Sequence, residues 1–290
     1  MFTTAEQRAI GQLSAPDGRL AVLAADQRTK LRQGLEAAGL AADVASMRAF
    51  KVDLVSALAP IAPAMLLDPE IALPAVVEDG ALPARTGVLV SLERSGSRRT
   101  AEGLREAQLL PGIGAAGVRE LGGTGAKLLL RLRADREDAG GANAEVLRTA
   151  VADCAAHSLL LIVEVLVYRL DDEPDERFQR MRPDLIREAA LLAEECGARY
   201  LKLEYPGSEA GCAALTASLQ RPWALLSAGV DHETFVGQLR TALAAGAAGF
   251  IAGRSIWQEP MALTGEERSA FLHGPARRRL EELLDVAARY

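Results

Sequence analysis

Short apolar runs alternate with longer helical patterns along this chain, and that alternation limits the possible folds more than any other feature. Continuous apolar runs separated by helices indicate a parallel sheet covered on both faces. Eight runs have the length and composition of buried strands, at residues 20–25, 64–67, 87–92, 127–132, 159–165, 200–204, 224–228 and 249–252. Helical patterns between them include residues 144–156, 183–196 and 234–245, and Gly197 and Gly246 stand where C-cap glycines belong.

Eight strand-helix units predict a single-domain (β/α)8 barrel. Its core covers about residues 18–260, and an amphipathic C-terminal helix within 265–290 packs on the barrel or on a partner. A doubly wound open sheet is the alternative. No Gly-x-Gly-x-x-Gly pattern or phosphate-binding loop motif follows the first apolar run, so the usual nucleotide signatures of that alternative are missing.

Charge and composition exclude some classes of function. The formal net charge of −6 argues against a nucleic-acid surface, where basic residues supply most of the affinity. No uncharged apolar stretch is long enough to span a membrane, and residues 1–12 do not resemble a signal peptide. Cys154, Cys196 and Cys212 are odd in number and lack metal-ligand spacing, so we expect reduced thiols in a cytoplasmic protein.

Charged residues interrupt the apolar strands, mostly at or near their carboxyl ends. Asp26 follows the first strand, Lys127 lies on the fourth, Glu164 on the fifth, and Lys202 with Glu204 on the sixth. A buried charge is costly without a reason, and barrel enzymes place their sites at the carboxyl ends of the strands. These residues therefore predict a pocket there, although Asp26 by itself is also a common turn residue.

The two-residue period of a strand decides which of these side chains face the barrel interior. On the sixth strand Leu201 and Leu203 pack on the helices, and Lys202 points inward. Lys127, Glu164 and Lys202 lie on neighbouring strands, so they can meet. An amine near another cation in a desolvated place has a lowered pKa, and a neutral lysine attacks carbonyl groups. A buried Lys–Glu pair that only stabilises the barrel is the alternative.

The last two strands end in residues suited to an anion. Ser227-Ala-Gly229 ends the seventh strand, and Gly253-Arg254 ends the eighth. Barrels often bind phosphate at this place through backbone N–H groups, and an arginine beside them suits a phosphate monoester. Glycine is also common after strands. Four arginines after the third strand form either a solvated loop or part of a second anion site; they are Arg94, Arg98, Arg99 and Arg105.

Metal chemistry and serine or cysteine hydrolysis have no support in the sequence. His157, His232 and His273 are scattered, and none of them pairs with a second histidine in the kind of motif that a catalytic zinc site needs. No Ser–His–Asp or Cys–His grouping is present.

Several sequence blocks run in one order from about residue 18 to 260: Ala24-Ala-Asp-Gln-Arg28, Phe50-Lys-Val52, Leu67-Asp-Pro-Glu70, Val163-Glu164, Leu201-Lys-Leu-Glu-Tyr-Pro206, Leu225-Leu-Ser-Ala-Gly-Val230 and Gly249-Phe-Ile-Ala-Gly-Arg-Ser-Ile-Trp257. In content and order these blocks resemble the bacterial class I aldolases of the tagatose 1,6-bisphosphate aldolase group and the related sulfofructosephosphate aldolases.

The resemblance implies a (β/α)8 fold, no metal or organic cofactor, a phosphorylated ketose as substrate, and a homo-oligomer (dimer or tetramer). It implies that Lys202 is the Schiff-base lysine, Glu164 the acid/base carboxylate, Lys127 a second lysine that tunes the site, and Asp26 the acid near the reacting hydroxyl. The residues implied to surround the dihydroxyacetone phosphate end are Gln27, Ser227, Gly229, Gly253 and Arg254. Arg28 is implied for the other anionic end.

The two related groups imply different aldehyde products. Residues 92–99 partly resemble the bisphosphate aldolases, which would release glyceraldehyde 3-phosphate. The chain length and residues 154–164 are closer to the sulfosugar enzymes, which would release 3-sulfolactaldehyde. Three other functions remain as alternatives: another Schiff-base lyase or transaldolase on the same barrel, a metal-dependent aldolase, and a non-catalytic sugar-phosphate binding protein.

Overall fold

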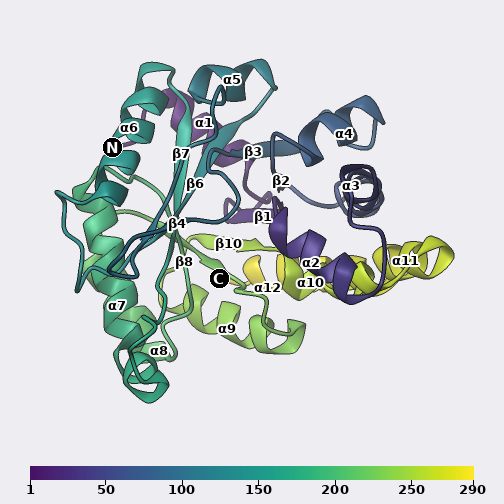
Figure 1. Cartoon of the computed structure of the whole chain (residues 1–290). Coiled ribbons are helices and arrows are strands. Elements are labelled where there is room, and N and C mark those ends of the chain that lie inside the picture. The colour runs from purple at the N-terminus through teal and green to yellow at the C-terminus, as the bar shows by residue number, and fades with distance from the viewer.

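Eight parallel strands close into a barrel in the computed structural model, which describes all 290 residues (Figure 1). The barrel strands are β1 (Leu20–Ala25), β2 (Ala64–Leu67), β3 (Gly87–Ser91), β6 (Gly125–Arg131), β7 (Leu160–Leu166), β8 (Leu201–Leu203), β9 (Trp223–Leu226) and β10 (Gly249–Ala252). They neighbour one another in chain order, and β1 pairs with β10 from Leu20–Gly249 to Leu23–Ala252. This pairing closes the sheet, so the predicted (β/α)8 fold is confirmed and the open-sheet alternative is wrong.

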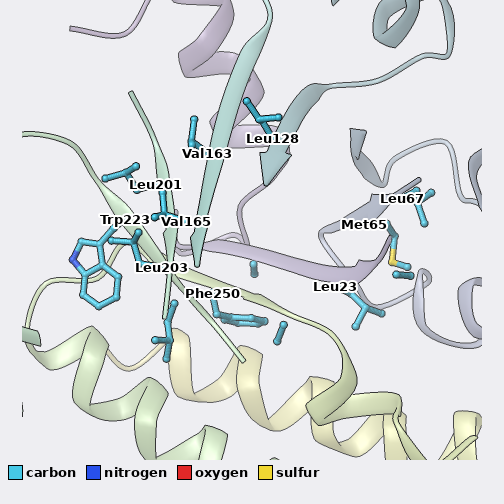
Figure 2. Packing of buried hydrophobic residues seen from close by; sticks show 14 of the residues in the cluster. Leu23, Met65, Leu67, Leu128, Val163, Val165, Leu201, Leu203, Trp223 and Phe250 are labelled. Atoms are coloured by element: carbon cyan, nitrogen blue, oxygen red, sulfur yellow. The ribbon is translucent and has the colours of Figure 1, made fainter. Parts of the chain in front are cut away.

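Helices alternate with the strands and surround them. They are α2 (Thr29–Ala37), α3 (Val44–Leu58), α4 (Ala72–Glu78), α5 (Ala115–Glu120), α6 (Ala142–Ala156), α7 (Asp175–Glu195), α8 (Glu209–Ser218), α9 (His232–Ala244) and α10 (Arg254–Trp257). Outward-facing strand residues such as Leu128, Val163 and Leu203 form the layer between strands and helices, as Figure 2 shows. Gly197 and Gly246 follow α7 and α9 with φ of 101° and 98°, the left-handed conformation predicted for C-caps.

The predicted helix at residues 183–196 begins earlier than expected. α7 starts at Asp175, so Pro183 lies inside the helix rather than at its first turn. A proline in a helix interior loses one backbone hydrogen bond and usually ends the helix. Here the residues before it continue the buried face, because Phe178 packs in the same core as Leu185. Tertiary packing therefore extends α7 on the amino-terminal side of Pro183, although proline is usually found in the first turn of a helix.

Strand ends also differ slightly from those predicted. Lys127 is the third residue of β6 rather than the first, because Gly125 and Ala126 already pair with Leu160 and Leu161 of β7. Glu204 follows the short β8. Ser227 and Ala228 follow β9 instead of belonging to it. A short hairpin of β4 (Arg98–Arg99) and β5 (Arg105–Glu106), not predicted, rises from the connection after β3.

The interior of the barrel is filled with apolar side chains at the amino-terminal end of the strands. Helix α1 (Thr4–Gln12) lies across that end, and its Ala9 together with the following Leu13 joins the interior cluster. Strand residues of the cluster include Leu20, Val22, Leu66, Leu89, Leu160 and Ile162, all almost fully buried. Arg199 pairs with Glu6 of α1 at 3.0 Å, which ties the helix to the residues before β8. The helix therefore closes one end of the barrel.

The predicted C-terminal helix is a run of three helical segments after a short 3-10 turn, η1 (Glu259–Ala262). The segments are α11 (Gly265–Phe271), the π-helical turn η2 (Leu272–Ala276) and α12 (Arg277–Ala287). α12 packs against α9 and buries Leu280 and Leu283, so its apolar face is covered by the barrel's own helices. No helix in the structure combines the length and hydropathy that crossing a membrane would need.

Candidate active site

Inward-facing positions of the strands change from apolar to charged toward the carboxyl ends. On β8 the side chains of Leu201 and Leu203 belong to the outer core, and Tyr200 belongs to the interior cluster, as the two-residue period predicts. Lys202 therefore points into the barrel. In the strand register Lys202 is paired with Glu164 of β7. The register thus places an amine and a carboxylate side by side on one face.

Four of the predicted residues form one connected cluster. Lys202 Nζ lies 2.8 Å from Glu164 Oε2, and the same oxygen lies 3.3 Å from Lys127 Nζ. Lys127 Nζ also contacts Asp26 Oδ2 at 2.7 Å. The relative exposure of Lys127 is 1 % and that of Lys202 is 4 %, so both amines are withdrawn from bulk water. The predicted meeting of Lys127, Glu164 and Lys202 is confirmed.

The two lysines differ in their surroundings. Burial lowers the pKa of Lys127, but the charges of Asp26, Glu93 and Glu164 more than offset that effect and hold the pKa above its usual value. Lys127 is therefore protonated at neutral pH. Lys202 has one carboxylate partner, Glu164, and its side chain lines an open cavity. Of the two amines, Lys202 is the one placed to reach a bound molecule.

The carboxylates of the cluster are held in their ionised form. Burial raises the pKa of Asp26, but Lys127 and Lys202 outweigh it and lower the pKa to about 2. Burial also raises the pKa of Glu164, and the same two lysines lower it below its usual value. Both groups are proton acceptors at neutral pH, which is the state that a general base requires.

Glu93 is a member of the cluster that sequence reasoning missed. Its Oε1 lies 2.5 Å from Lys127 Nζ, and its Oε2 accepts a hydrogen bond from the backbone N–H of Leu129 at 3.1 Å. Glu93 follows β3 at a position that shares the inward face with Leu89 and Ser91. The two-residue period applied past the end of the strand therefore carries the signal that would have found it.

A buried ion pair between Lys51 of α3 and Asp68 after β2 was also missed. The two side chains are fully buried, with Nζ and Oδ2 3.6 Å apart. Asp68 also accepts the backbone N–H of Ile71 at 2.7 Å, and Lys51 donates to the carbonyl of Ala25. The pair holds the backbone beside Asp26. Both residues lie in sequence blocks quoted above, but neither lies on a strand, so the two-residue period does not predict where their side chains point.

A cavity of about 230 Å³ opens at the carboxyl ends of the strands beside the cluster. Lys202 and Glu164 line it together with five of the six predicted substrate-binding residues, namely Gln27, Ser227, Gly229, Gly253 and Arg254. Asp26 and Lys127 do not line the cavity. Lys127 contacts Glu164 at 3.3 Å, and Asp26 contacts Lys127 at 2.7 Å. Gln27 donates from Nε2 to Asp26 Oδ1 at 3.1 Å, and its buried Oε1 has no partner within the protein.

The ends of β9 and β10 form a close pair of turns around Arg254. Gly229 has φ of 81°, and a Cβ there would lie 2.9 Å from the Arg254 guanidinium carbon. The N–H of Gly253 donates to Ser227 Oγ at 3.4 Å. Arg254 has no carboxylate within ion-pair distance, and its one hydrogen bond is a long one of 3.5 Å to the carbonyl of Ala228. A free guanidinium beside two glycines suits an anionic group.

Several of the arginines that the sequence suggested for binding an anion are already engaged by other groups of the protein. Arg28 is buried, pairs with Glu70, and donates to the carbonyl of Glu93 at 2.6 Å. In the hairpin, Arg98 pairs with Glu106. Arg99 pairs with Asp171, and Arg94 is exposed. Arg105 instead stacks on the ring of Tyr168 at 5.3 Å. Arg131 of β6, which sequence analysis did not select, lines the cavity.

The chain holds no group of three or more His, Cys, Asp or Glu side chains with the geometry of a metal site. The three histidines lie on or after outer helices, and all three cysteines are free and buried. The ionisable groups that line the cavity are the amine of Lys202, two carboxylates and two guanidinium groups.

Comparison with known proteins agrees with the sequence resemblance. Residues 20–259 match the model of the DeoC/LacD family aldolases. Tagatose 1,6-diphosphate aldolase 2 of Enterococcus faecalis is 28 % identical, over 99 % of this chain and 95 % of the relative. Tagatose 1,6-diphosphate aldolase of Staphylococcus aureus is 30 % identical, over 86 % of this chain and 83 % of the relative.

Among solved structures, a protein of Corynebacterium glutamicum superposes with a TM-score of 0.65 at 20 % identity and covers 98 % of this chain and 92 % of its own. A Schiff-base-forming fructose 1,6-bisphosphate aldolase superposes with a TM-score of 0.62 at 17 % identity, covering 94 % of this chain and 98 % of its own. At these identities the likeness shows the barrel fold. The match of the family model across the whole barrel shows more: the chain belongs to the DeoC/LacD family of aldolases and is a lyase.

Proposed function

We propose that the chain is a class I aldolase that cleaves a ketose 1-phosphate reversibly to dihydroxyacetone phosphate and an aldehyde. The observation that carries the proposal is the 2.8 Å contact of Lys202 Nζ with Glu164 Oε2 at the wall of a cavity that also holds an unpaired Arg254. A nucleophilic amine, an ionised carboxylate and a cation for a phosphate are the three groups that such chemistry needs.

Substrate binding begins at Arg254. The guanidinium, the N–H groups around Gly229 and Gly253, and Ser227 Oγ bind the C1 phosphate, which places the C2 carbonyl beside Lys202. Nζ of Lys202 loses a proton to Glu164 and adds to C2, forming a carbinolamine. Glu164 returns the proton to the leaving oxygen, water departs, and an iminium remains.

The iminium is the electron sink for cleavage. Asp26 or Glu164 accepts the proton of the C4 hydroxyl, the C3–C4 bond breaks, and its electron pair moves toward the iminium to give an enamine. The aldehyde leaves. Protonation of the enamine at C3 and hydrolysis of the resulting imine release dihydroxyacetone phosphate and free Lys202. Lys127, held by three carboxylates, fixes their positions and supplies a constant positive charge.

Borohydride reduction in the presence of dihydroxyacetone phosphate and EDTA tests the proposal. The expected result is a stable adduct that intact mass and peptide mapping assign to Lys202. Absence of an adduct, together with chelator-sensitive cleavage of ketose phosphates, would support a metal-dependent aldolase instead.

Two classes of aldehyde product fit the proposed reaction. The tagatose 1,6-diphosphate aldolase relatives favour glyceraldehyde 3-phosphate as the second product. The sequence resemblance to the sulfosugar enzymes favours 3-sulfolactaldehyde. The two share a second anionic group at the end of the sugar away from C1. Cytoplasmic location and a homo-oligomeric state stay predictions of the sequence.

A further inference from the structure

Arg131 is the one cation of the cavity wall whose function the proposed chemistry leaves unassigned. It is the last residue of β6, on the same inward face as Lys127 and Leu129. Its side chain is half-buried, lines the cavity, and makes no hydrogen bond or ion pair within the protein. Desolvating a guanidinium without a partner costs free energy, so its position calls for a ligand.

The carboxylates nearest Arg131 are already engaged by other groups. Glu164 contacts both lysines of the cluster at 2.8 and 3.3 Å. Glu204 accepts the N–H of Val167 at 2.8 Å and contacts Arg182 at 2.8 Å. Glu93 contacts Lys127. None of the three lies within ion-pair distance of Arg131, so these carboxylates do not serve as its partner.

A second arginine without a carboxylate partner, Arg105, lies near it, because Nδ2 of Asn143 donates to the backbone carbonyls of both Arg105 and Arg131 at 3.0 and 3.2 Å. Arg105, from the β4–β5 hairpin, stacks on Tyr168 at 5.3 Å, and its backbone N–H donates to the hydroxyl of Tyr168 at 3.0 Å. Burial and the charge of Arg105 both lower the pKa of Arg131. Two neighbouring guanidinium groups without a counter-ion repel each other until an anion binds between or beside them.

The order of the strands places Arg131 across from the phosphate end. Around the barrel the sequence is β10, β9, β8, β7 and β6. Lys202 on β8 therefore lies two strands from Arg254, which follows β10, and two strands from Arg131 on β6. Two strand spacings are about 10 Å. A sugar chain bound at C2 by Lys202 can thus direct its two ends toward two different arginines.

Arg28, which the sequence resemblance implied for the far end, is neutralised by Glu70 and fixed by the carbonyl of Glu93. We propose that Arg131, supported by Arg105, binds the anionic group, phosphate or sulfonate, at the end of the ketose 1-phosphate away from C1, and selects doubly anionic ketoses over monophosphates. The proposal rests on the proposed function for the placement of C1 at Arg254 and C2 at Lys202.

Calorimetry with unreactive analogues tests the site without any chemistry. A hexitol 1,6-bisphosphate and a hexitol 1-phosphate are titrated into the wild type, Arg131→Leu, Arg131→Lys and Arg254→Leu. Arg136→Leu is the matched control, because this arginine follows the same strand but is 53 % exposed and outside the cavity. Thermal melts verify that each variant is folded.

The expected result is that Arg131→Leu weakens the bisphosphate by roughly 10- to 100-fold and leaves the monophosphate unchanged. Arg131→Lys restores part of the loss, Arg254→Leu weakens both analogues, and Arg136→Leu weakens neither. Equal losses for both analogues in Arg131→Leu, or no loss for the bisphosphate, would overturn the proposal.

Cleavage assays then separate the two sources of the distal anion. For wild type and Arg131→Leu, kcat/KM is measured with tagatose or fructose 1,6-bisphosphate and with 6-deoxy-6-sulfofructose 1-phosphate, each relative to fructose 1-phosphate. The ratio that falls in the variant identifies phosphate or sulfonate as the group bound, and a fall in neither overturns the assignment. Failure of borohydride trapping in the wild type would overturn the proposed function and leave the calorimetric result standing.

Discussion

The Nζ of Lys202 lies 2.8 Å from Oε2 of Glu164 on the adjacent strand, and a second lysine, Lys127, lies 3.3 Å from the same oxygen. One carboxylate therefore serves two amines with different duties. Lys127 is surrounded by three carboxylates and stays charged, whereas Lys202 faces the cavity. This division separates a fixed positive charge from an amine that faces the cavity, within one buried cluster.

Replacing Lys202 with Met keeps the volume of the side chain and removes the amine. Because the covalent route needs that amine, we expect cleavage to fall by at least about 10³-fold and borohydride labelling to disappear. Labelling is measured by intact mass after reduction with dihydroxyacetone phosphate, with EDTA present. An adduct of undiminished yield in the variant, on any other lysine, would show that the nucleophile has been assigned wrongly.

Glu164→Gln removes the proton acceptor but keeps the shape. The expected loss in kcat is roughly 10²- to 10⁴-fold, the range for a general acid or base. The adduct on Lys202 still forms, but slowly, and single-turnover trapping over time measures the rate. A variant that forms the adduct at the wild-type rate and only cleaves slowly would restrict Glu164 to the C–C bond step.

Asp26→Asn tests how much the charge of Asp26 in the cluster contributes to the free energy of unfolding. The pKa of Asp26 is lowered to about 2, below the value of 3.8 for a free side chain. The ionised carboxylate therefore stabilises the fold above pH 3.8, and this contribution is lost as pH falls from about 4 toward 2. At pH 7 the variant should lose about 2 kcal/mol of unfolding free energy.

Urea unfolding of the wild type and Asp26→Asn is compared at several pH values between 7 and 3. The difference between the two proteins should shrink below pH 4, because Asp26 then takes up a proton in the unfolded wild type while it stays ionised in the folded protein down to about pH 2. A difference that stays constant over this range would contradict the lowered pKa.

Gly229→Ala tests the position of Arg254. A left-handed φ costs a non-glycine residue about 1–2 kcal/mol, and the new Cβ would lie 2.9 Å from the guanidinium carbon. Displacement of Arg254 should raise KM for a ketose 1-phosphate by roughly 10-fold. Gly237→Ala in α9, where a Cβ meets nothing within 4 Å, is the control and should leave KM unchanged. Equal KM values for both variants would argue against Arg254 as the phosphate ligand.

Leu13→Ala tests the closure of the barrel by α1. Leu13 is fully buried in the interior cluster, so the variant should lose about 2–5 kcal/mol of stability. Because the residue is remote from the cavity, KM should not change in the folded fraction. Thermal and urea unfolding measure the first effect, and kinetics at low temperature measure the second. A large rise in KM would mean that α1 also shapes the active site.

The barrel could be predicted because its strands are continuous apolar runs and its polar exceptions follow a two-residue period. That period was enough to place Lys127, Glu164 and Lys202 together. Glu93 would have needed the same period to be continued past the end of β3. The period carries no information about the Lys51–Asp68 pair, because Lys51 lies on helix α3 and Asp68 follows the end of β2. The start of α7 before Pro183 was also hidden, since the packing of Phe178 outweighs the local preference of proline.

The partners of charged side chains are the part that sequence did not reveal. Arg28 and Arg131 are equally basic in the sequence, yet one is paired with Glu70 and the other is unpaired in the cavity wall. Pairing depends on distances between segments that are far apart in the chain. The function of an arginine can therefore be inferred only when the fold is known, whereas a strand can be recognised from the sequence alone.

Helix α1 closes the amino-terminal end of the barrel, and this closure bears on how the products of the proposed reaction leave the site. That end is filled by Leu13 and its neighbours, and the cavity opens at the carboxyl ends of the strands. Under the proposed chemistry the aldehyde leaves through this opening while the three-carbon fragment is still attached to Lys202. In that proposed chemistry the covalent bond to Lys202 sets the order of release through this opening, aldehyde first and dihydroxyacetone phosphate second, and in the synthetic direction the reverse order of entry.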